Sequence, residues 1–285
     1  MNGVPNSAAT ELADARIAFI GGGNMARSLI GGLIRNGASA QNVAVAEPNA
    51  ELLDALMRDF HVATHASNEE ASNAADVVVL AVKPQVMKTV CASLHAIVQA
   101  RKPLIITIAA GIRIDQLERW LGPGIPIVRC MPNTPALIGA GATGLCANAH
   151  ANATQRGLAQ RILGAAGLTA WIDDEALMDT VTALSGSGPA YFCLLVQALE
   201  DAAVGQGMPR ETARALAVQT CLGAGRMLSE VGAPPQELRQ RVTSPGGTTQ
   251  AALDSFAADG FSAIVARAIE AAVRRGRELS AHLSD

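Results

Sequence analysis

The sequence predicts an α/β domain with a parallel sheet covered by helices on both faces, followed by an all-helical domain. Between residues 15 and 172, short apolar segments rich in Val and Ile alternate with segments of helical periodicity. Near-continuous apolar strands are typical of parallel sheets that are buried on both faces. From residue 173 to 285 the strand pattern disappears, and long alanine-rich segments separated by Gly and Pro predict helices alone.

Each element has a sequence signal of its own. Apolar runs predict strands at 16–21, 43–47, 77–82, 103–109, 125–130 and 141–147. Amphipathic segments predict the later helices at 175–184, 189–206, 210–231, 248–258 and 261–282. Alternation of strands and helices in the first part indicates a doubly wound, Rossmann-like α/β sheet. Residues 1–14 lack the basic head and apolar centre of a signal peptide, and we interpret them as a flexible leader.

Composition narrows the class of partner. The chain has 285 residues, 49% of them apolar, and a formal net charge of −3. Binders of nucleic acid or of anionic membranes need clustered basic residues, and the net negative charge of this chain argues against both classes. In addition, no apolar run approaches the ~20 residues that span a bilayer. The five cysteines have no CxxC spacing, which predicts free thiols in a reducing cytoplasm rather than a zinc site or redox dithiol. We therefore expect a cytoplasmic protein with a small-molecule partner, and no nucleic acid, membrane or metal.

A glycine-rich turn follows the first expected strand directly and precedes an apolar-periodic helix. Gly21, Gly23 and Ala26 match the GxGxxG/A pattern of dinucleotide-binding turns. In that pattern the first glycine makes a tight turn, the second lets a pyrophosphate approach, and the third small residue packs helix against strand. A plain tight turn is the alternative, but the flanking strand and helix favour a dinucleotide site formed by Gly21, Gly22, Gly23, Asn24 and Met25.

Glu47 ends the second expected strand, 24 residues after Gly23. An acid at this place usually accepts a hydrogen bond from the ribose 2′-hydroxyl of NAD and repels the 2′-phosphate of NADP. No arginine stands beside Glu47 to bind that phosphate. The local chemistry favours NADH, and the alternative is a solvated carboxylate at a strand end.

Three later segments leave the expected sheet at its carboxyl edge, where ligands bind in this architecture. The first contains Lys83, one of only three lysines, before a helix that starts with a proline; the second contains small residues that a nicotinamide ribose could approach. In the third, two prolines stiffen a loop around Asn133 and Thr134. From the first two segments we assign to the cofactor Ala81, Val82, Lys83, Pro84, Ala109, Ala110 and Gly111.

The remaining chemistry points to an unusual hydride acceptor. A carbonyl acceptor usually needs a proton donor such as Lys, His or Tyr, yet the helical half has no lysine, its only histidine is His282, and Tyr191 is the sole tyrosine of the chain. A protonated imine needs no such donor, because hydride addition alone neutralises it. The segment LSGSGPAYF (184–192) either forms a tight entry into a helix or one wall of a pocket.

The segment TSPGGTTQAALD (243–254) predicts a helix start with free N–H groups, which would suit a carboxylate. One hydroxyl would remain for a ring nitrogen. The alternative is a helix start capped by a hydroxyl after a Ser-Pro turn. The candidate substrate residues of this segment are Ser244, Gly246, Gly247, Thr248 and Thr249.

Five motifs, IGGGNMA, AVKPQ, RCMPNTP, ALSGSGPAYF and VTSPGGTT, resemble those of pyrroline-5-carboxylate reductases in order and spacing, from Arg16 onward. The resemblance implies NAD(P)H-dependent reduction of 1-pyrroline-5-carboxylate to L-proline, the last step of proline biosynthesis. That substrate is a cyclic imine bearing a carboxylate, in agreement with the argument from the residues.

The resemblance also implies roles for individual residues. The loop from Ser244 to Thr249 would hold the substrate carboxylate, with the catalytic Thr249 hydroxyl bonding the ring nitrogen; Glu175 would line the product site, and Asn68 would contact the adenosine side. It further implies an all-α dimerisation domain and a homo-oligomer, a dimer or a decamer of five dimers. One departure concerns the cofactor: many relatives have a small hydroxyl or basic residue where this chain has Glu47, which puts an NADPH preference in doubt.

Three alternatives remain at this stage. A β-hydroxy-acid dehydrogenase shares the expected architecture but normally uses a lysine in its helical half, and this chain has none there. A redox sensor would bind the dinucleotide without turnover. The hydroxyl-rich segment 243–254, which would suit a substrate carboxylate, argues against this interpretation. An imine reductase for larger or sulfur-containing ring acids would share every motif. An assay of cofactor oxidation separates the sensor from the enzymes.

Overall fold

The computed structural model describes residues 12 and 14–283, and the leader expected over 1–14 lies, apart from residues 12 and 14, outside them. Contacts divide the chain into two compact units, Met1–Gly186 with Val273–Asp285, and Ser187–Ala272. The long last helix, α13 (Phe261–His282), contributes residues to both units. The domain boundary expected after residue 172 stays a prediction. We describe each unit separately.

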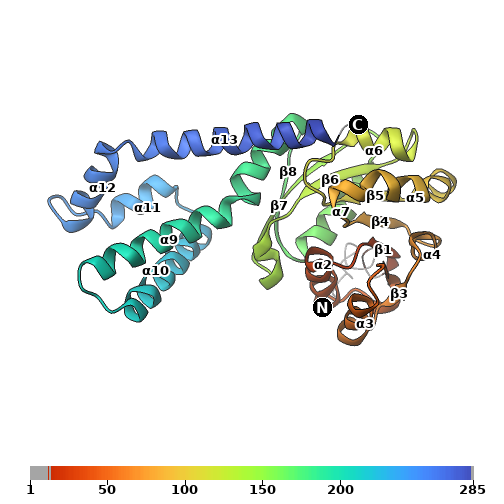
Figure 1. Cartoon of the computed structure of the whole chain (residues 1–285), viewed down its shortest axis with the longest axis horizontal. Coiled ribbons are helices and arrows are strands. Elements are labelled where there is room, and N and C mark those ends of the chain that lie inside the picture. Colours follow the sequence, from red (N-terminus) through yellow and green to blue (C-terminus); the bar gives the residue numbers. More distant parts are fainter. Residues whose placement is uncertain (1–11, 13, 284–285) are drawn as a thin grey trace, which may run out of the picture. The chain divides into compact units, whose positions relative to one another are not determined.

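The first unit contains an eight-stranded sheet in the order β3-β2-β1-β4-β5-β6-β7-β8 (Figure 1). Neighbouring strands are parallel except for the antiparallel pair β6–β7. Strand order reverses between β1 and β4, and such switch points open a ligand crevice at the carboxyl ends of the strands. The predicted Rossmann-like class is confirmed, with strands β1 (Ile17–Ile20), β2 (Val43–Ala46), β3 (Ala63–His65), β4 (Val77–Leu80), β5 (Leu104–Thr107), β6 (Ile127–Met131), β7 (Gly141–Ala147) and β8 (Gly167–Trp171).

Two of these strands, β3 and β8, were not expected from the sequence. Both lie at the edges of the sheet. An edge strand need not be buried on both faces, so it does not require a continuous apolar run. In β8, for example, the Leu168 side chain is 72% exposed. Continuous apolar runs therefore mark the central strands, and the edge strands carry no such signal.

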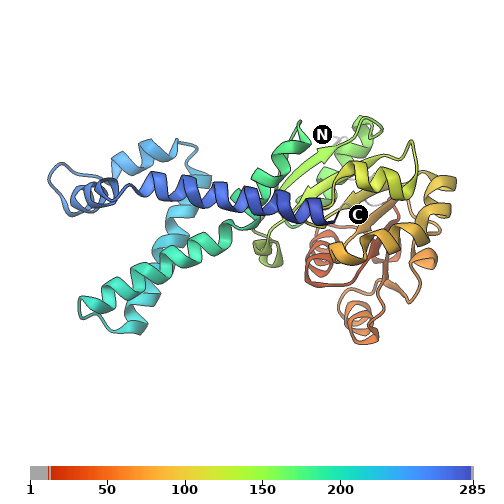
Figure 2. The ribbon, with the colours of Figure 1, turned by 45° about the horizontal axis from the view of Figure 1, so that its top comes forward.

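Helices cover both faces of the sheet (Figure 2). Side chains alternate along each strand, so that Phe19 of β1 enters one core and Ile20 the other, and both are fully buried. The first core includes residues of α2 (Asn24–Arg35), α3 (Ala50–Phe60) and α7 (Ala153–Gly164). The second includes residues of α4 (Asn68–Ser72), α5 (Met87–Arg101), α6 (Ile114–Leu121) and α8 (Met178–Val181). Short 3-10 turns complete the unit: η1 (Ala40–Asn42), η2 (Pro84–Val86), η3 (Thr134–Ile138) and η4 (Glu175–Leu177).

The single helix expected at 175–184 is three short pieces: η4, α8 and a π turn, η5 (Thr182–Gly186). Side chains of this segment take part in tertiary packing, and Met178 is fully buried in the second core. The sequence periodicity indicated helical backbone correctly but gave no signal of these interruptions.

The second unit is entirely helical, as predicted. It contains α9 (Gly188–Gly205), α10 (Arg210–Glu230), α11 (Pro235–Arg241), α12 (Thr248–Ala258) and the first half of α13. The short helix α11 was not expected from the sequence. Helices α9 and α10 pack against each other, and the Glu200 carboxylate, 7% exposed, forms ion pairs with Arg210 at 2.8 Å and Arg214 at 2.9 Å.

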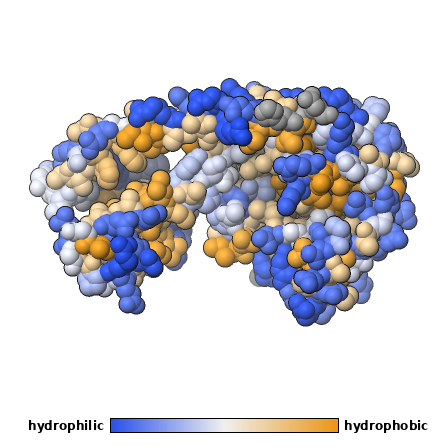
Figure 3. Space-filling view, viewed as in Figure 1, coloured by the Kyte–Doolittle hydropathy of each residue, from blue (hydrophilic) through white to orange (hydrophobic). Residues whose placement is uncertain are grey.

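This unit buries little apolar surface by itself. Within 187–272, all of which the structure describes, Ala213 and Leu238 are the only hydrophobic side chains that are buried. Large apolar side chains are exposed on α9, α10 and α13, and Figure 3 shows apolar surface on the helical unit. No helix within the described part of the chain is long and apolar enough to cross a membrane.

Candidate functional site

The glycine turn between β1 and α2 has the geometry that its sequence predicts. Gly21 has φ +103°, a backbone region that favours glycine, and its N–H donates to the Ala46 carbonyl at 2.8 Å. A Cβ at Gly21 would lie 2.6 Å from the Ala81 carbonyl oxygen. The chain can therefore pass between the ends of β2 and β4 at this point only without a side chain.

The same turn leaves the N-terminus of α2 open. Gly23 is the N-cap residue, with φ −68° and ψ −178°, and no atom lies within 4 Å of the position where its Cβ would be. No side chain caps this helix end, and its first turn contains no acidic residue. The first N–H groups of a helix have no intrahelical acceptor, so this end can bind a phosphate group.

Ends of β2 and β3 bring Glu47 and Asn68 to the same edge of the sheet. The Glu47 carboxylate accepts hydrogen bonds from the N–H groups of Gly22 at 2.8 Å and Asn49 at 3.1 Å. The N–H of Glu47 donates to the His65 carbonyl, and Asn68 begins α4 shortly after β3. Glu47 thus has a fixed position beside the glycine turn.

Segments after β4 and β5 leave the sheet at this edge too. Parallel pairing aligns Ile20 with Leu80 and Leu80 with Thr107, so the residues that follow these strands emerge side by side. Of the residues assigned to the cofactor here, Lys83 and Ala110 are exposed, Ala109 is buried, and the others are half-buried. The structure brings the predicted cofactor residues of all five strand ends to one edge.

The Asn133 amide is hydrogen-bonded at both ends within the protein. Its Nδ2 donates to the Ser185 carbonyl at 3.0 Å, and its Oδ1 accepts from the Ala142 N–H at 2.8 Å. The side chain is nearly buried. The amide therefore links the backbone at Ser185 to the backbone at Ala142.

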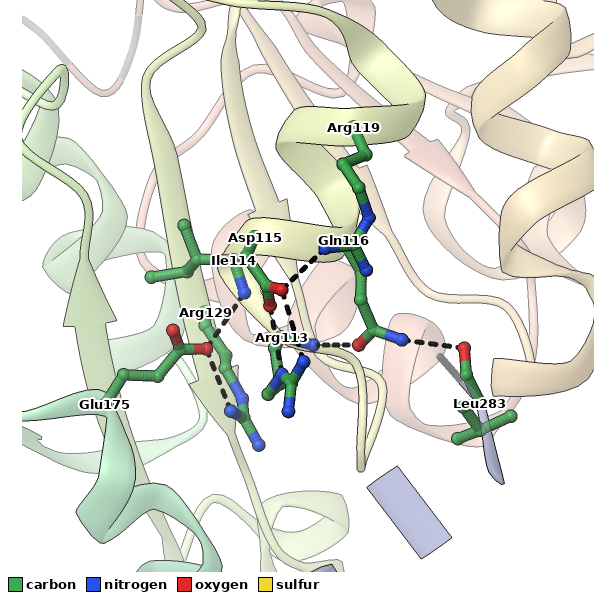
Figure 4. Close-up of polar contacts among 8 residues, drawn as sticks. All are labelled: Arg113, Ile114, Asp115, Gln116, Arg119, Arg129, Glu175 and Leu283. Carbon is green, nitrogen blue, oxygen red and sulfur yellow. Dashed lines mark hydrogen bonds and ion pairs between the residues drawn. The ribbon is translucent and has the colours of Figure 1, made fainter. Parts of the chain in front are cut away.

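Glu175 takes part in a polar cluster beside α6, shown in Figure 4. Its Oε1 accepts from the Ile114 N–H and from Nη1 of Arg129, both at 2.9 Å. The Arg129 side chain, on β6, is 6% exposed. Sequence analysis did not single out Arg129, although a charged residue inside the apolar strand IVRCM was a usable signal, because buried charges are normally paired.

Further members of this cluster surround the start of α6. Gln116 accepts from the Arg113 N–H at 2.7 Å and donates to the Leu283 carbonyl at 2.6 Å (Figure 4). Hydrogen bonding to Asp115 raises the pKa of Arg113, and the same contact lowers the pKa of Asp115. Sequence analysis gave no signal for Gln116, whose partner lies 167 residues away.

In the second unit, the segment from Ser244 to Thr249 forms a glycine turn at the start of α12. Gly246 has φ +71°, and Gly247 is the N-cap residue, with no hydrogen bond from a side chain. The hydroxyl-capped alternative therefore does not describe this helix start. Ser244, Thr248 and Thr249 are exposed, and the first turn has no acidic residue. This helix end combines free N–H groups with available hydroxyls.

The five cysteines are free thiols, and Cys91, Cys130 and Cys146 are buried. Burial raises the pKa of Cys91 to about 12, so this thiol stays neutral. Within the described residues, no group of three or more His, Cys, Asp or Glu side chains is placed to hold a metal ion.

Comparison with known proteins identifies the family. A family model described as "Pyrroline-5-carboxylate reductase dimerisation" matches residues 175–279, and one described as "NADP oxidoreductase coenzyme F420-dependent" matches residues 16–111. A pyrroline-5-carboxylate reductase from Pseudomonas aeruginosa is 53% identical over 270 residues, which cover 94% of this chain and 98% of the relative. The chain belongs to the pyrroline-5-carboxylate reductase family.

Solved structures of the family agree. The pyrroline-5-carboxylate reductase of Coxiella burnetii is 44% identical with a TM-score of 0.91, and the alignment covers 93% of this chain and 98% of that one. The Plasmodium falciparum pyrroline carboxylate reductase, whose structure has NADP bound, is 31% identical with a TM-score of 0.81, covering 94% and 99%.

Membership in the pyrroline-5-carboxylate reductase family decides against two of the three alternatives that the sequence left open. The protein is an oxidoreductase of proline biosynthesis that reduces 1-pyrroline-5-carboxylate to L-proline with a nicotinamide dinucleotide. The β-hydroxy-acid dehydrogenase and sensor interpretations are set aside. A dimerisation domain indicates a homo-oligomer.

Proposed function

We propose that the turn from Ser244 to Thr249 binds the carboxylate of 1-pyrroline-5-carboxylate, while the Thr249 hydroxyl bonds the ring nitrogen. The observation that carries this proposal is the start of α12, where N–H groups are free of any side-chain cap and hydroxyls are exposed. The positive end of the helix favours a carboxylate. Gly246 and Gly247 leave room for the ligand, because no Cβ covers the backbone at either position.

The first unit fits a dinucleotide cofactor. The pyrophosphate would meet Gly21, Gly22, Gly23, Asn24 and Met25 at the open end of α2. The adenosine side would meet Glu47 and Asn68, and the nicotinamide side would meet Ala81, Val82, Lys83, Pro84, Ala109, Ala110 and Gly111. When bound, the reduced nicotinamide supplies the hydride for C5 of the pyrroline ring.

The protein's own contribution is to orient and stabilise the substrate rather than to donate a proton. Hydride addition to C5 neutralises the iminium, whose ring nitrogen already carries its proton, so no acid is required at that nitrogen. Holding the carboxylate on backbone N–H groups fixes the ring, and orientation of two reactants can supply a large part of a rate enhancement. The Thr249 hydroxyl accepts a hydrogen bond from the protonated ring nitrogen, which keeps the imine in its reactive charged form.

We propose a preference for NADH, which Glu47 supports. Its carboxylate is held beside the glycine turn by the N–H groups of Gly22 and Asn49. A 2′-phosphate on the adenosine ribose would bring further negative charge against this fixed carboxylate, whereas a 2′-hydroxyl could donate a hydrogen bond to it.

We propose that the helical unit forms a dimer with a second copy of the chain, and that five dimers assemble into a decamer. The small buried core of residues 187–272 supports the dimer, because a unit of this size normally buries much more apolar surface. An apolar groove of about 580 Å3 between α9 and α10 includes Phe192, Val218 and Leu222 in its lining. The decamer rests on the family resemblance alone.

A reducing cytoplasm is the proposed location. Its support is the set of free thiols at all five cysteines, which suits a compartment where disulfides are rare.

The Thr249→Val variant tests the substrate proposal with little change in side-chain shape. We expect turnover of the imine substrate, measured as kcat, to fall about 10- to 100-fold, the size of a lost hydrogen bond to a charged group. The Kd of the dinucleotide should not change. Thr243→Val is the matched control, because the Thr243 hydroxyl donates to the Arg239 carbonyl within the protein. Equal kcat values in wild type and Thr249→Val would remove Thr249 from the mechanism.

A further inference from the structure

The loop between β5 and α6, residues 108–113, carries the small residues assigned to the nicotinamide side of the cofactor. It leaves β5 at the carboxyl edge of the sheet and passes through Gly111, which has φ +79°. Its end is the start of α6, so the position of this helix start fixes the path of the loop. Two side chains from outside the loop hold that helix start.

The first is Glu175, which lies 61 residues away in the sequence. Its Oε1 accepts from the Ile114 N–H at 2.9 Å and thereby caps α6 with a negative charge. The same oxygen accepts from Arg129 at 2.9 Å (Figure 4), whose side chain is 6% exposed. The Glu175 side chain is 28% exposed, so only the arginine of this pair is buried. Such an ion pair is weak evidence for stability, because removing charges from water costs about as much as their attraction returns. We therefore look for a role of the Glu175–Arg129 pair other than stabilising the fold.

The second is Gln116, which is fully buried. Its Oε1 accepts from the Arg113 N–H at 2.7 Å, and its Nε2 donates to the Leu283 carbonyl at 2.6 Å. Leu283 follows α13 directly, and its Cδ1 lies 3.1 Å from the place that a Cβ on Gly111 would take. The residue that follows α13 therefore packs on the loop, and Gln116 holds it there.

We infer that Glu175 and Gln116 are positioning residues, which fix the loop 108–113 in the path that receives the nicotinamide ribose. Glu175 acts through the Ile114 N–H and Arg129, and Gln116 acts through the Arg113 N–H and the Leu283 carbonyl. This inference rests on the proposed cofactor site. It differs from the role that the resemblance gives Glu175, which is contact with the substrate or product.

A paired variant, Arg129→Met with Glu175→Leu, separates positioning from folding. It removes both charges together, so no unpaired charge remains buried, and it leaves the Ile114 N–H without its acceptor. We expect amide hydrogen exchange over residues 108–114 to become faster in the free protein. The Kd of NADH, measured by its fluorescence, should rise about five- to tenfold, the effect of losing a helix cap. At saturating NADH, the KM for the imine substrate should stay unchanged.

Two further variants and a control variant make the test specific. Glu175→Gln keeps an oxygen that can accept from the Ile114 N–H, so its Kd for NADH should stay within about twofold of wild type. Gln116→Leu should raise the Kd of NADH in the same direction as the paired variant. Glu118→Ala is the matched control on α6, since Glu118 accepts from Asn148 rather than from the loop, and its Kd should not change.

The outcomes distinguish this inference from the proposed function. Absence of turnover in the wild-type enzyme with NADH and NADPH would contradict the proposed function itself. Normal wild-type turnover, with unchanged hydrogen exchange and unchanged Kd of NADH in the paired variant, would overturn the inference alone. A raised KM for the imine with an unchanged Kd of NADH would also overturn it and assign Glu175 to the substrate.

Discussion

Gly23→Ala tests the cofactor site with unusual clarity, because the protein itself has room for the added methyl group. No atom lies within 4 Å of the position of the new Cβ, and φ −68° suits any residue. Two small effects on stability oppose each other: alanine restricts the unfolded chain, and alanine is a poorer N-cap than glycine. The free energy of unfolding should therefore change by less than about 1 kcal/mol.

Dinucleotide binding should respond very differently. The methyl group would stand at the open end of α2, where the pyrophosphate must approach the backbone closely. We expect the Kd of NADH to rise at least about tenfold, which corresponds to about 1.4 kcal/mol. Fluorescence titration gives the Kd, and calorimetric Tm gives the stability, which should shift by no more than about 4 °C.

Gly21→Ala is the comparison variant. Its Cβ would lie 2.6 Å from a backbone oxygen at φ +103°, so we expect a loss of about 2 kcal/mol or more in stability together with weaker binding. If Gly23→Ala binds NADH with the wild-type Kd, the pyrophosphate does not lie at this turn, and the reasoning is refuted.

Further predictions concern the cofactor, the dimer and the thiols. Glu47→Gln keeps an acceptor for the Gly22 N–H but removes the charge, so the ratio of kcat/KM for NADPH over NADH should rise about tenfold; an unchanged ratio would dismiss Glu47 as a determinant. Leu222→Glu should give monomers in analytical ultracentrifugation, because it places a charge in the apolar groove, whereas a stable dimer would locate the interface elsewhere. Cys193 is exposed in the single chain and lines the same groove, so iodoacetamide should label it in that monomer but not in the wild-type dimer. Cys91 should stay unlabelled in both folded forms at slightly alkaline pH, since a raised pKa of about 12 keeps its thiol protonated below that pH; modification of folded protein at Cys91 would contradict its burial.

Much of the fold could be predicted because burial leaves a direct trace in the sequence. Central strands such as β4 are buried on both faces and read as unbroken apolar runs. Edge strands such as β3 and β8 lack this constraint and leave no such trace. The short helix α11 begins at the second of two consecutive prolines, and its length of seven residues gives too little periodicity to recognise.

The candidate site was predictable where its function depends on local backbone chemistry. Gly21 and Gly246 both have positive φ, as expected of glycines in tight turns at helix starts. The contacts of Glu175 were not predictable, because they join residues that lie 46 and 61 positions apart in the sequence. Asn133 illustrates the same limit, since its amide connects β7 to a π turn that the sequence does not reveal.

The most direct test of the central claim is the initial rate at which absorbance of the reduced nicotinamide falls in the presence of 1-pyrroline-5-carboxylate, measured for wild type and Thr249→Val with NADH and with NADPH. We expect wild-type turnover with both, faster with NADH, and a much lower kcat in the variant at the same dinucleotide affinity. Turnover that is equal in the variant and the wild type would contradict the proposal that the start of α12 holds the imine for hydride transfer.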